Sequence, residues 1–134
     1  MYECYQQPDG LTVLLAPRKD VKSATCMVFV GTGSRYENNT NRGISHFLEH
    51  MLFKGTEKRP TAKQIAEEID TIGGEFNAYT SKEYTVYYIK SRAADLDLCL
   101  DMLSDMTINS RLDESEITKE KGVIIEEISM IEDN

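Results

Sequence analysis

Residues 44–53 read Ile-Ser-His-Phe-Leu-Glu-His-Met-Leu-Phe and contain the only two histidines of this 134-residue chain, His46 and His50, with Glu49 between them. The stretch is apolar on almost every side, so we expect a buried helix. Residues four apart stack on one face of a helix and residues three apart flank it, so both imidazoles and the Glu49 carboxylate point the same way. Burying three titratable groups is costly unless they are paired, and a divalent metal ion would pair them.

The last helix carries a second informative feature. It is predicted to begin with the capping box Asp113-x-x-Glu116 and to run toward Glu132. At about 100° per residue, Glu120 and Glu127 fall on its apolar side, whereas Glu126 faces solvent. That apolar side is formed by Ile117, Val123, Ile124, Ile128 and Ile131. Glutamate is seldom buried without a partner, so Glu127 is a better ligand candidate than Glu126.

These residues together match the donor set of a catalytic zinc site. Such a site uses three protein ligands and leaves the fourth position to water, and His46, His50 and Glu127 supply the three. Zinc lowers the pKa of its water and polarises a carbonyl, but a base must still move the proton. Glu49 is placed for that task, and Glu120 for a hydrogen bond to a histidine or the water.

Other interpretations of the same residues stay open at this point. Two histidines four apart can be a chance pair that is satisfied by hydrogen bonds in a core. Glu120 can equally be a solvated or ion-paired residue at the helix edge. A structural zinc site would need a fourth protein ligand, and no cysteine or further histidine is positioned to supply one.

The rest of the chain predicts alternating strands and helices. Strand character is found at residues 11–15, 24–30, 76–79 and 84–89. We expect the first two runs to form a hairpin through the polar residues 20–23, and the last two through residues 80–83. The glycine-rich residues 31–34 lack the lysine of a phosphate-binding loop and are interpreted as a plain loop.

Two more helices are expected between and after these strands. One begins at Thr61 with the capping box Thr61-x-x-Gln64 and ends at Gly73-Gly74. The other covers residues 93–106, with Leu96, Leu100 and Leu103 as its apolar stripe. Its aspartates Asp95, Asp97 and Asp101 are expected on the solvated side. The predicted fold class is α+β, a largely antiparallel sheet with helices packed on one face.

Composition narrows the possible partners and location. The formal net charge of −8 argues against nucleic acid, since binding phosphates requires a basic surface. No apolar run approaches the length of a membrane span and no charged-then-apolar leader follows Met1, so we expect no membrane association and a cytoplasmic location. The three cysteines, Cys4, Cys26 and Cys99, are scattered and are expected to be reduced thiols.

The segment His46-Phe47-Leu48-Glu49-His50 is the inverted zinc motif H-x-x-E-H of the inverzincins. Three further segments strengthen the likeness: GTGSR at 31–35, GGEFNAYTSKEYTVYY at 73–88 and EKGVIIEE at 120–127. With GISHFLEHMLFKGT at 43–56, they occur in family order over nearly the whole chain. The chain thus resembles the N-terminal part of the pitrilysin, insulysin and mitochondrial processing peptidase β-subunit family, and most closely its bacterial processing-protease branch.

The resemblance implies a zinc-dependent endopeptidase. It implies one zinc ion on His46, His50 and Glu127, with Glu49 as general base and Glu120 as the supporting acidic residue. It also implies that an extended peptide adds as a strand beside Phe76, Asn77, Ala78 and Tyr79, which we otherwise interpret as an ordinary hairpin arm. The expected substrates are unfolded peptides or presequence-like segments, cleaved by zinc-activated water.

The resemblance also raises an expectation about length. Family members resemble two or more homologous α+β domains closing as a clamshell, with an arginine and tyrosine pair from the opposing half helping to hold substrate. Residues 1–134 are therefore expected to be the N-terminal portion of one zinc-binding catalytic domain. A homodimer or pairing with a second homologous domain or chain would complete it. The alternatives are a non-catalytic peptide-binding or scaffold subunit, or a fragment inactive through truncation.

Overall fold

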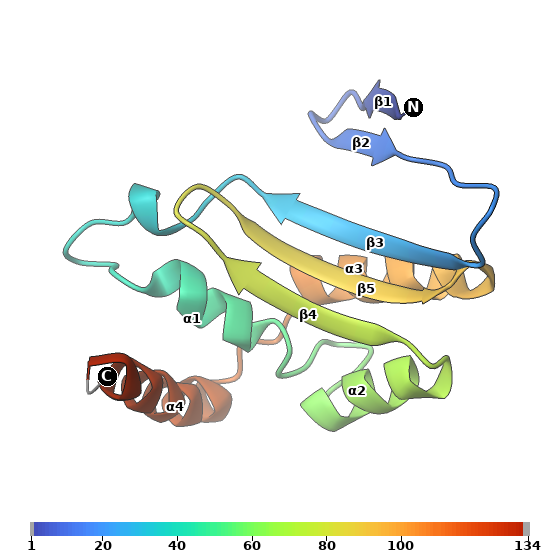
Figure 1. Ribbon diagram of the computed structural model, residues 1–134. Coiled ribbons are helices and arrows are strands. Elements are labelled where there is room, and N and C mark those ends of the chain that lie inside the picture. Colours follow the sequence, from blue (N-terminus) through green and yellow to red (C-terminus); the bar gives the residue numbers. More distant parts are fainter. Residues whose placement is uncertain (1, 133–134) are drawn as a thin grey trace.

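The computed structural model describes residues 2–132, and a three-stranded antiparallel sheet lies at its centre (Figure 1). The strands are β3 (Ser23–Val30), β4 (Glu75–Thr80) and β5 (Thr85–Arg92), in the order β3-β5-β4. β4 and β5 form the predicted hairpin, in which Ala78 lies opposite Tyr87. The α+β class with an antiparallel sheet is confirmed.

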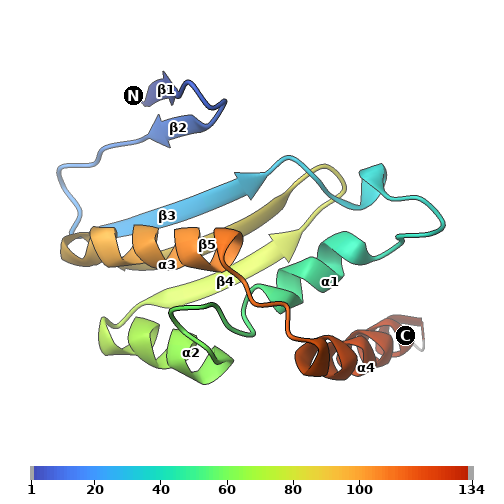
Figure 2. The same ribbon diagram turned by 180° about the vertical axis from the view of Figure 1, so that it is seen from behind.

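Three helices contribute to a single core on one face of this sheet. They are α1 (Ile44–Met51), α2 (Ala62–Thr71) and α3 (Leu96–Ile108), the last preceded by a 3-10 turn, η2 (Ala93–Asp95). α3 lies behind the sheet in Figure 1 and in front of it in Figure 2, so it covers that face directly. The core cluster consists of Cys26, Leu52, Ile65, Ile69, Tyr87, Ile89, Cys99, Met102, Leu103 and Met106.

The predicted capping box at the start of α2 is present. Thr61 Oγ1 accepts a hydrogen bond from the Gln64 backbone N–H at 3.2 Å, and Gln64 Oε1 accepts one from the Thr61 N–H at 3.1 Å. These two bonds satisfy donors that the helix itself leaves free. Ile65 and Ile69 are then fully buried against the sheet.

The buried stripe of α3 differs from the predicted one. Leu96 and Leu100 are exposed, and of the three leucines only Leu103 is buried. Cys99, Met102 and Met106 complete the stripe, at the i, i+3 and i+7 spacing of one helix face. The prediction was wrong because it ranked leucine above cysteine and methionine, and so chose a face rotated from the true one.

A buried arginine ties the segment after α1 to α2 and α3. Arg59 is only 7% exposed and bonds Glu68 of α2 and both Asp101 and Asp105 of α3. Asp105 is itself 1% exposed, and it also accepts a hydrogen bond from Thr56 at 2.5 Å. The Asp101 side chain is 44% exposed, in line with the expected solvated side, and it also belongs to this ion-pair network.

The predicted hairpin between residues 11–15 and 24–30 was also wrong. β2 (Thr12–Leu15) instead pairs with β1 (Glu3–Gln6) in a separate two-stranded sheet. The chain reverses between these strands at Gly10, whose φ of +94° suits glycine. β1 was not predicted because its four residues are all exposed and show no apolar alternation.

The last helix, α4 (Glu114–Glu132), contacts α1 beside the sheet, as Figure 1 shows. Ile124 is buried, but Val123 and Ile128 are 43% and 50% exposed, so the predicted apolar face is only partly covered. The Ile131 side chain lies outside the described residues. α1 likewise exposes Ile44 and Leu48, contrary to the expectation of a fully buried helix. None of the helices within residues 2–132 has both the length and the apolarity needed to cross a membrane.

Candidate metal centre

The start of α1 is held in place by a carboxylate from the preceding loop. Gly43 adopts a φ of +86° at the N-cap, and its N–H donates to Glu37 Oε2 at 2.7 Å. The Ser45 N–H donates to the other oxygen, Oε1, at 2.9 Å. A carboxylate at a helix N-terminus satisfies free N–H groups and is favoured by the helix dipole. Glu37 therefore fixes where the first turn, and with it His46, is placed.

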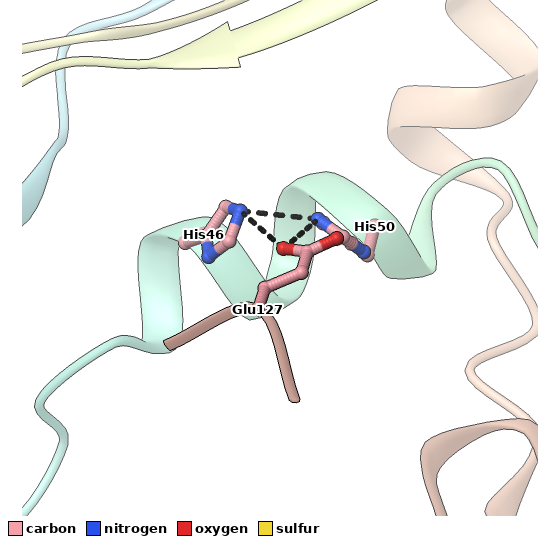
Figure 3. A group of neighbouring side chains, drawn as sticks. All are labelled: His46, His50 and Glu127. Atoms are coloured by element: carbon pink, nitrogen blue, oxygen red, sulfur yellow. Dashed lines mark hydrogen bonds and ion pairs between the residues drawn. The ribbon is translucent and has the colours of Figure 1, made fainter. Parts of the chain in front are cut away.

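The two histidines of α1 present the same ring nitrogen to a common point (Figure 3). The Nε2 atoms of His46 and His50 are 3.1 Å apart, and the rings meet edge to face. The other nitrogen of His50, Nδ1, lies 2.8 Å from Glu120 Oε1. Because a carboxylate can only accept, Nδ1 carries the proton and the Nε2 lone pair is left for a metal ion.

Glu127 brings the third donor atom from α4, as Figure 3 shows. Its Oε2 lies 3.8 Å from the Nε2 atoms of both His46 and His50. Donors about 2.0–2.1 Å from a tetrahedral zinc ion are separated by roughly 3.3 Å, so the spacing fits with a shift of a few tenths of an ångström. Among the described residues, this group holds three ligands and no fourth. That composition is typical of a catalytic site and not of a structural one.

The three donor side chains are not deeply buried. Those of His46 and Glu127 are 41% and 44% exposed, and that of His50 is 20% exposed. The expectation of a buried triad was therefore wrong. The reason is that α1 exposes its outer side, and α4 packs mainly against α1. Solvent can reach the donor atoms, as a hydrolytic site requires.

Glu120 is the buried carboxylate of the site, at 4% exposure. Its Oε1 is paired with His50 Nδ1, and its Oε2 lies 2.6 Å from Lys54 Nζ. Burial acts to raise the pKa of Glu120, but the bonds from Lys54 and His50 outweigh it and leave this pKa below its ordinary value. Glu120 is therefore ionised at neutral pH and serves as the acceptor for His50.

Glu49 stands beside the three donors without joining them. Its Oε2 accepts a hydrogen bond from Thr80 Oγ1, at the end of β4, at 2.5 Å. Burial, with a smaller contribution from the Glu49 charge, raises the pKa of Tyr87. Glu49 is thus anchored through one oxygen and is not one of the three donors.

The glycine-rich loop before α1 holds the β4–β5 turn in place. The Ser34 and Arg35 N–H groups, in the 3-10 turn η1 (Ser34–Tyr36), donate to the Ser81 and Lys82 carbonyls at 3.2 and 2.8 Å. A Cβ on Gly33 would lie 2.3 Å from the Ser81 oxygen. These N–H groups bind backbone, which agrees with the interpretation of residues 31–34 as a plain loop. The contact holds the end of β4, with Thr80, beside α1.

β4 forms one edge of the three-stranded sheet. Its residues alternate, so that Phe76 and Ala78 are half-buried, whereas Asn77 and Tyr79 are exposed. Within residues 2–132, only β5 pairs with it. The Ala78 N–H donates to the side chain of Asn77 at 2.8 Å. This edge offers backbone to which another strand could add.

Sequence reasoning missed three residues that support the site. Lys54 could have been found, because it follows His46 and His50 at the same four-residue spacing. Glu37 and Thr80 reach α1 from a loop and from a strand, so no local spacing points to them. The discrimination between Glu126 and Glu127 agrees with the structure, which leaves Glu126 exposed and turns Glu127 toward the histidines. Cys26 and Cys99 are free and buried, and Cys4 is free and exposed.

A comparison with protein families matches residues 12–134 to the model described as insulinase, peptidase family M16. The chain belongs to the insulinase family. It is 48% identical over 133 residues to an uncharacterized zinc protease, YmxG, of Bacillus subtilis. It is also 48% identical over 118 residues to the mitochondrial-processing peptidase β-subunit of Bos taurus. These alignments cover 99% and 87% of this chain, but only 32% and 24% of the relatives.

A solved structure extends the comparison to the fold. The crystal structure of a protease from Helicobacter pylori superposes with a TM-score of 0.89 at 30% sequence identity. The match covers 95% of this chain and 30% of that protein. This insulinase-family chain therefore spans about a third or less of the length of the relatives it matches. It matches part of the fold of that larger protein, as the resemblance in its sequence implied.

Proposed function

We propose that residues 1–134 are the N-terminal portion of the zinc-binding domain of a zinc-dependent endopeptidase. The observation that carries the proposal is the convergence of His46 Nε2, His50 Nε2 and Glu127 Oε2, while Glu49 on the same helix is not one of these donors and bonds Thr80. Three nitrogen and oxygen donors with an open side suit catalytic zinc. Relatives named as zinc proteases and processing-peptidase β-subunits support the same chemistry.

The chain's own residues would divide the work of peptide hydrolysis. Zinc, when bound, would lower the pKa of a water molecule and polarise the scissile carbonyl. Glu49, held through one oxygen by Thr80, would take the proton from that water with its other oxygen and pass it to the leaving amine. Glu120 would keep the proton of His50 on Nδ1 and so keep Nε2 available.

The edge strand β4 would position the substrate. An extended peptide that pairs with the backbone of residues 76–79 would run past Thr80, which bonds the base Glu49. Backbone pairing tolerates many sequences, which suits unfolded or presequence-like peptides, and it holds one peptide bond at the site. The missing side of the site would come from a second homologous domain or chain, as the subunit names of the β-subunit relatives suggest.

The substitution Glu49→Gln tests this proposal. Zinc should still bind, because Glu49 is not a ligand, while hydrolysis of an unfolded peptide by the protein that carries this chain should fall by about 100-fold or more. Glu126→Gln, an exposed carboxylate on α4, is the matched control and should change neither property. Peptide hydrolysis that is retained in Glu49→Gln would contradict the assignment of Glu49 as the general base. A protein that takes up zinc but cleaves no peptide would favour the non-catalytic peptide-binding subunit instead.

A further inference from the structure

We propose that Lys54 is a positioning residue for the metal site, acting through Glu120 on His50. Lys54 Nζ lies 2.6 Å from Glu120 Oε2, and Glu120 Oε1 lies 2.8 Å from His50 Nδ1. The three side chains therefore form a chain of polar contacts from the Lys54 ammonium group, through the Glu120 carboxylate, to the His50 imidazole. This inference rests on the proposed function, because it assumes that His50 is a zinc ligand.

The placement of Lys54 follows from the end of α1. The helix ends at Met51, but two further turn-type hydrogen bonds follow it. The Phe53 N–H donates to the His50 carbonyl at 3.3 Å, and the Lys54 N–H donates to the Met51 carbonyl at 3.1 Å. The turn therefore continues far enough to keep Lys54 in the row of His46 and His50. Opposite them, Glu127 and Glu120 lie two turns apart on α4, about 10 Å along its axis. Glu127 therefore faces His46 and His50, and Glu120 contacts His50 and Lys54.

The contact with Lys54 prevents the Glu120 carboxylate from rotating. A carboxylate bonded through a single oxygen can rotate and exchange its two oxygens. Glu120 uses both oxygens, one for each partner, and its side chain is 5% exposed, so little water can replace either bond. Lys54 therefore holds Oε1 on His50 Nδ1, and thereby holds the ring plane that aims Nε2 at the metal position.

Lys54 also balances the charge of the site. Two carboxylates, Glu120 and Glu127, contact the histidines, and Glu49 lies on the same helix as the histidines. Among the described residues, Lys54 is the only lysine or arginine that forms an ion pair with one of these carboxylates. The Lys54 side chain is 28% exposed, so the pair is shielded from bulk water on the Glu120 side. Removing the ammonium would leave a buried carboxylate with one partner fewer, a costly state that disturbs its geometry.

Zinc affinity of the chain tests the proposal without any need for catalysis. Binding is measured by competition with a chromophoric chelator for wild type, Lys54→Met, Lys54→Gln and Lys54→Arg. Outer partners of zinc ligands typically change metal affinity by about 10–100-fold, and we expect that loss for Met and Gln. Arg keeps the charge and should restore affinity to within a few-fold. Lys121→Met, an exposed lysine beside Glu120 in sequence, should bind as wild type does.

A double variant separates positioning from a general effect on folding. If Lys54 acts through Glu120, adding Lys54→Met to Glu120→Gln should weaken zinc binding little further. Equal zinc affinity of wild type, Lys54→Met and Lys54→Gln would overturn the inference while leaving the proposed function standing. The inference would also be overturned if the losses of zinc affinity in the two single variants added fully in the double variant. Absence of zinc uptake by the wild-type chain would instead overturn the proposed function, and this inference with it. Lys54→Gln keeps the test decisive should Lys54→Met fail to fold.

Discussion

Glu126 and Glu127 are chemically identical neighbours with different surroundings. The helical phase of α4 predicts which of them turns inward, and Glu127 is the one whose Oε2 lies 3.8 Å from both histidines. His46, His50 and Glu49 could be assigned from one turn of helix in the same way. Lys54 and Glu120 show the limit of such reasoning, because their partnership depends on how two helices pack.

The single residue Asp105 also leads to a prediction of how the free energy of unfolding depends on pH. Burial acts to raise its pKa, but hydrogen bonds from Thr56, Asn109 and Arg59 outweigh burial and hold this pKa below its ordinary value. A carboxyl whose pKa is lower in the folded state stabilises the protein above its unfolded pKa, near 3.9. That stabilisation is lost as the pH falls through the folded pKa. The free energy of unfolding should therefore decrease steeply below about pH 4.

Urea unfolding of Asp105→Asn at several pH values checks this. The variant should be less stable at pH 7 by about 1–3 kcal/mol, because Arg59 loses a charged partner in a buried position. Its free energy of unfolding should also change less with pH below about 4. Asp97→Asn, an exposed aspartate on the same helix, should behave as wild type does. An unchanged pH dependence in Asp105→Asn would show that this carboxyl does not contribute as argued.

Between elements, the loop before α1 and the β4–β5 turn form the contact that brings Thr80 to Glu49. Gly33 allows this contact, because any Cβ there would lie 2.3 Å from the Ser81 oxygen. Gly33 itself has an extended backbone, so the requirement is one of space and not of conformation. Gly31, two residues earlier, has nothing within 4 Å of an added Cβ. Gly31 is therefore a suitable control position for a substitution at Gly33.

Gly33→Ala should lower the free energy of unfolding by about 1–3 kcal/mol, a typical cost of forcing atoms into occupied space. Gly31→Ala should stay within about 0.5 kcal/mol of wild type, as exposed substitutions usually do. Urea titration followed by circular dichroism measures both. If the two variants were equally stable, the close approach of loop and turn would not be a constraint on the fold.

The elements and the β4–β5 pairing could largely be predicted, whereas the partner of β2 and the buried face of α3 could not. Helix α2 follows from its capping box and the β4–β5 hairpin from its alternation, since these signals are local. The pairing of β2 with β1 was missed because β1 has no apolar pattern. The stripe of α3 was misplaced because its buried face uses cysteine and methionine. Packing against the sheet decided the buried face of α3, whereas β1 and β2 pair through a local turn that lacks an apolar signal.

At the scale of the whole molecule, helices cover one face of the three-stranded sheet, and among the described residues the opposite face is exposed along β3. Met27 and Phe29 of β3 alternate with the core residue Val28, and both are exposed. Val123 and Ile128 of α4 are exposed as well, although their helix bears a site residue. The chain spans about a third or less of the length of its relatives. Sequence reasoning overestimated burial at Val123 and Ile128 because an apolar pattern does not say which neighbour covers it.

The central claim is that His46, His50 and Glu127 bind one zinc ion, and zinc stoichiometry tests it most directly. Metal content is measured after dialysis for wild type, Glu127→Gln and the matched control Glu126→Gln. We predict one zinc per chain for wild type and Glu126→Gln, and a large loss for Glu127→Gln. Wild-type protein that takes up no zinc, or a loss of zinc confined to Glu126→Gln, would contradict the account.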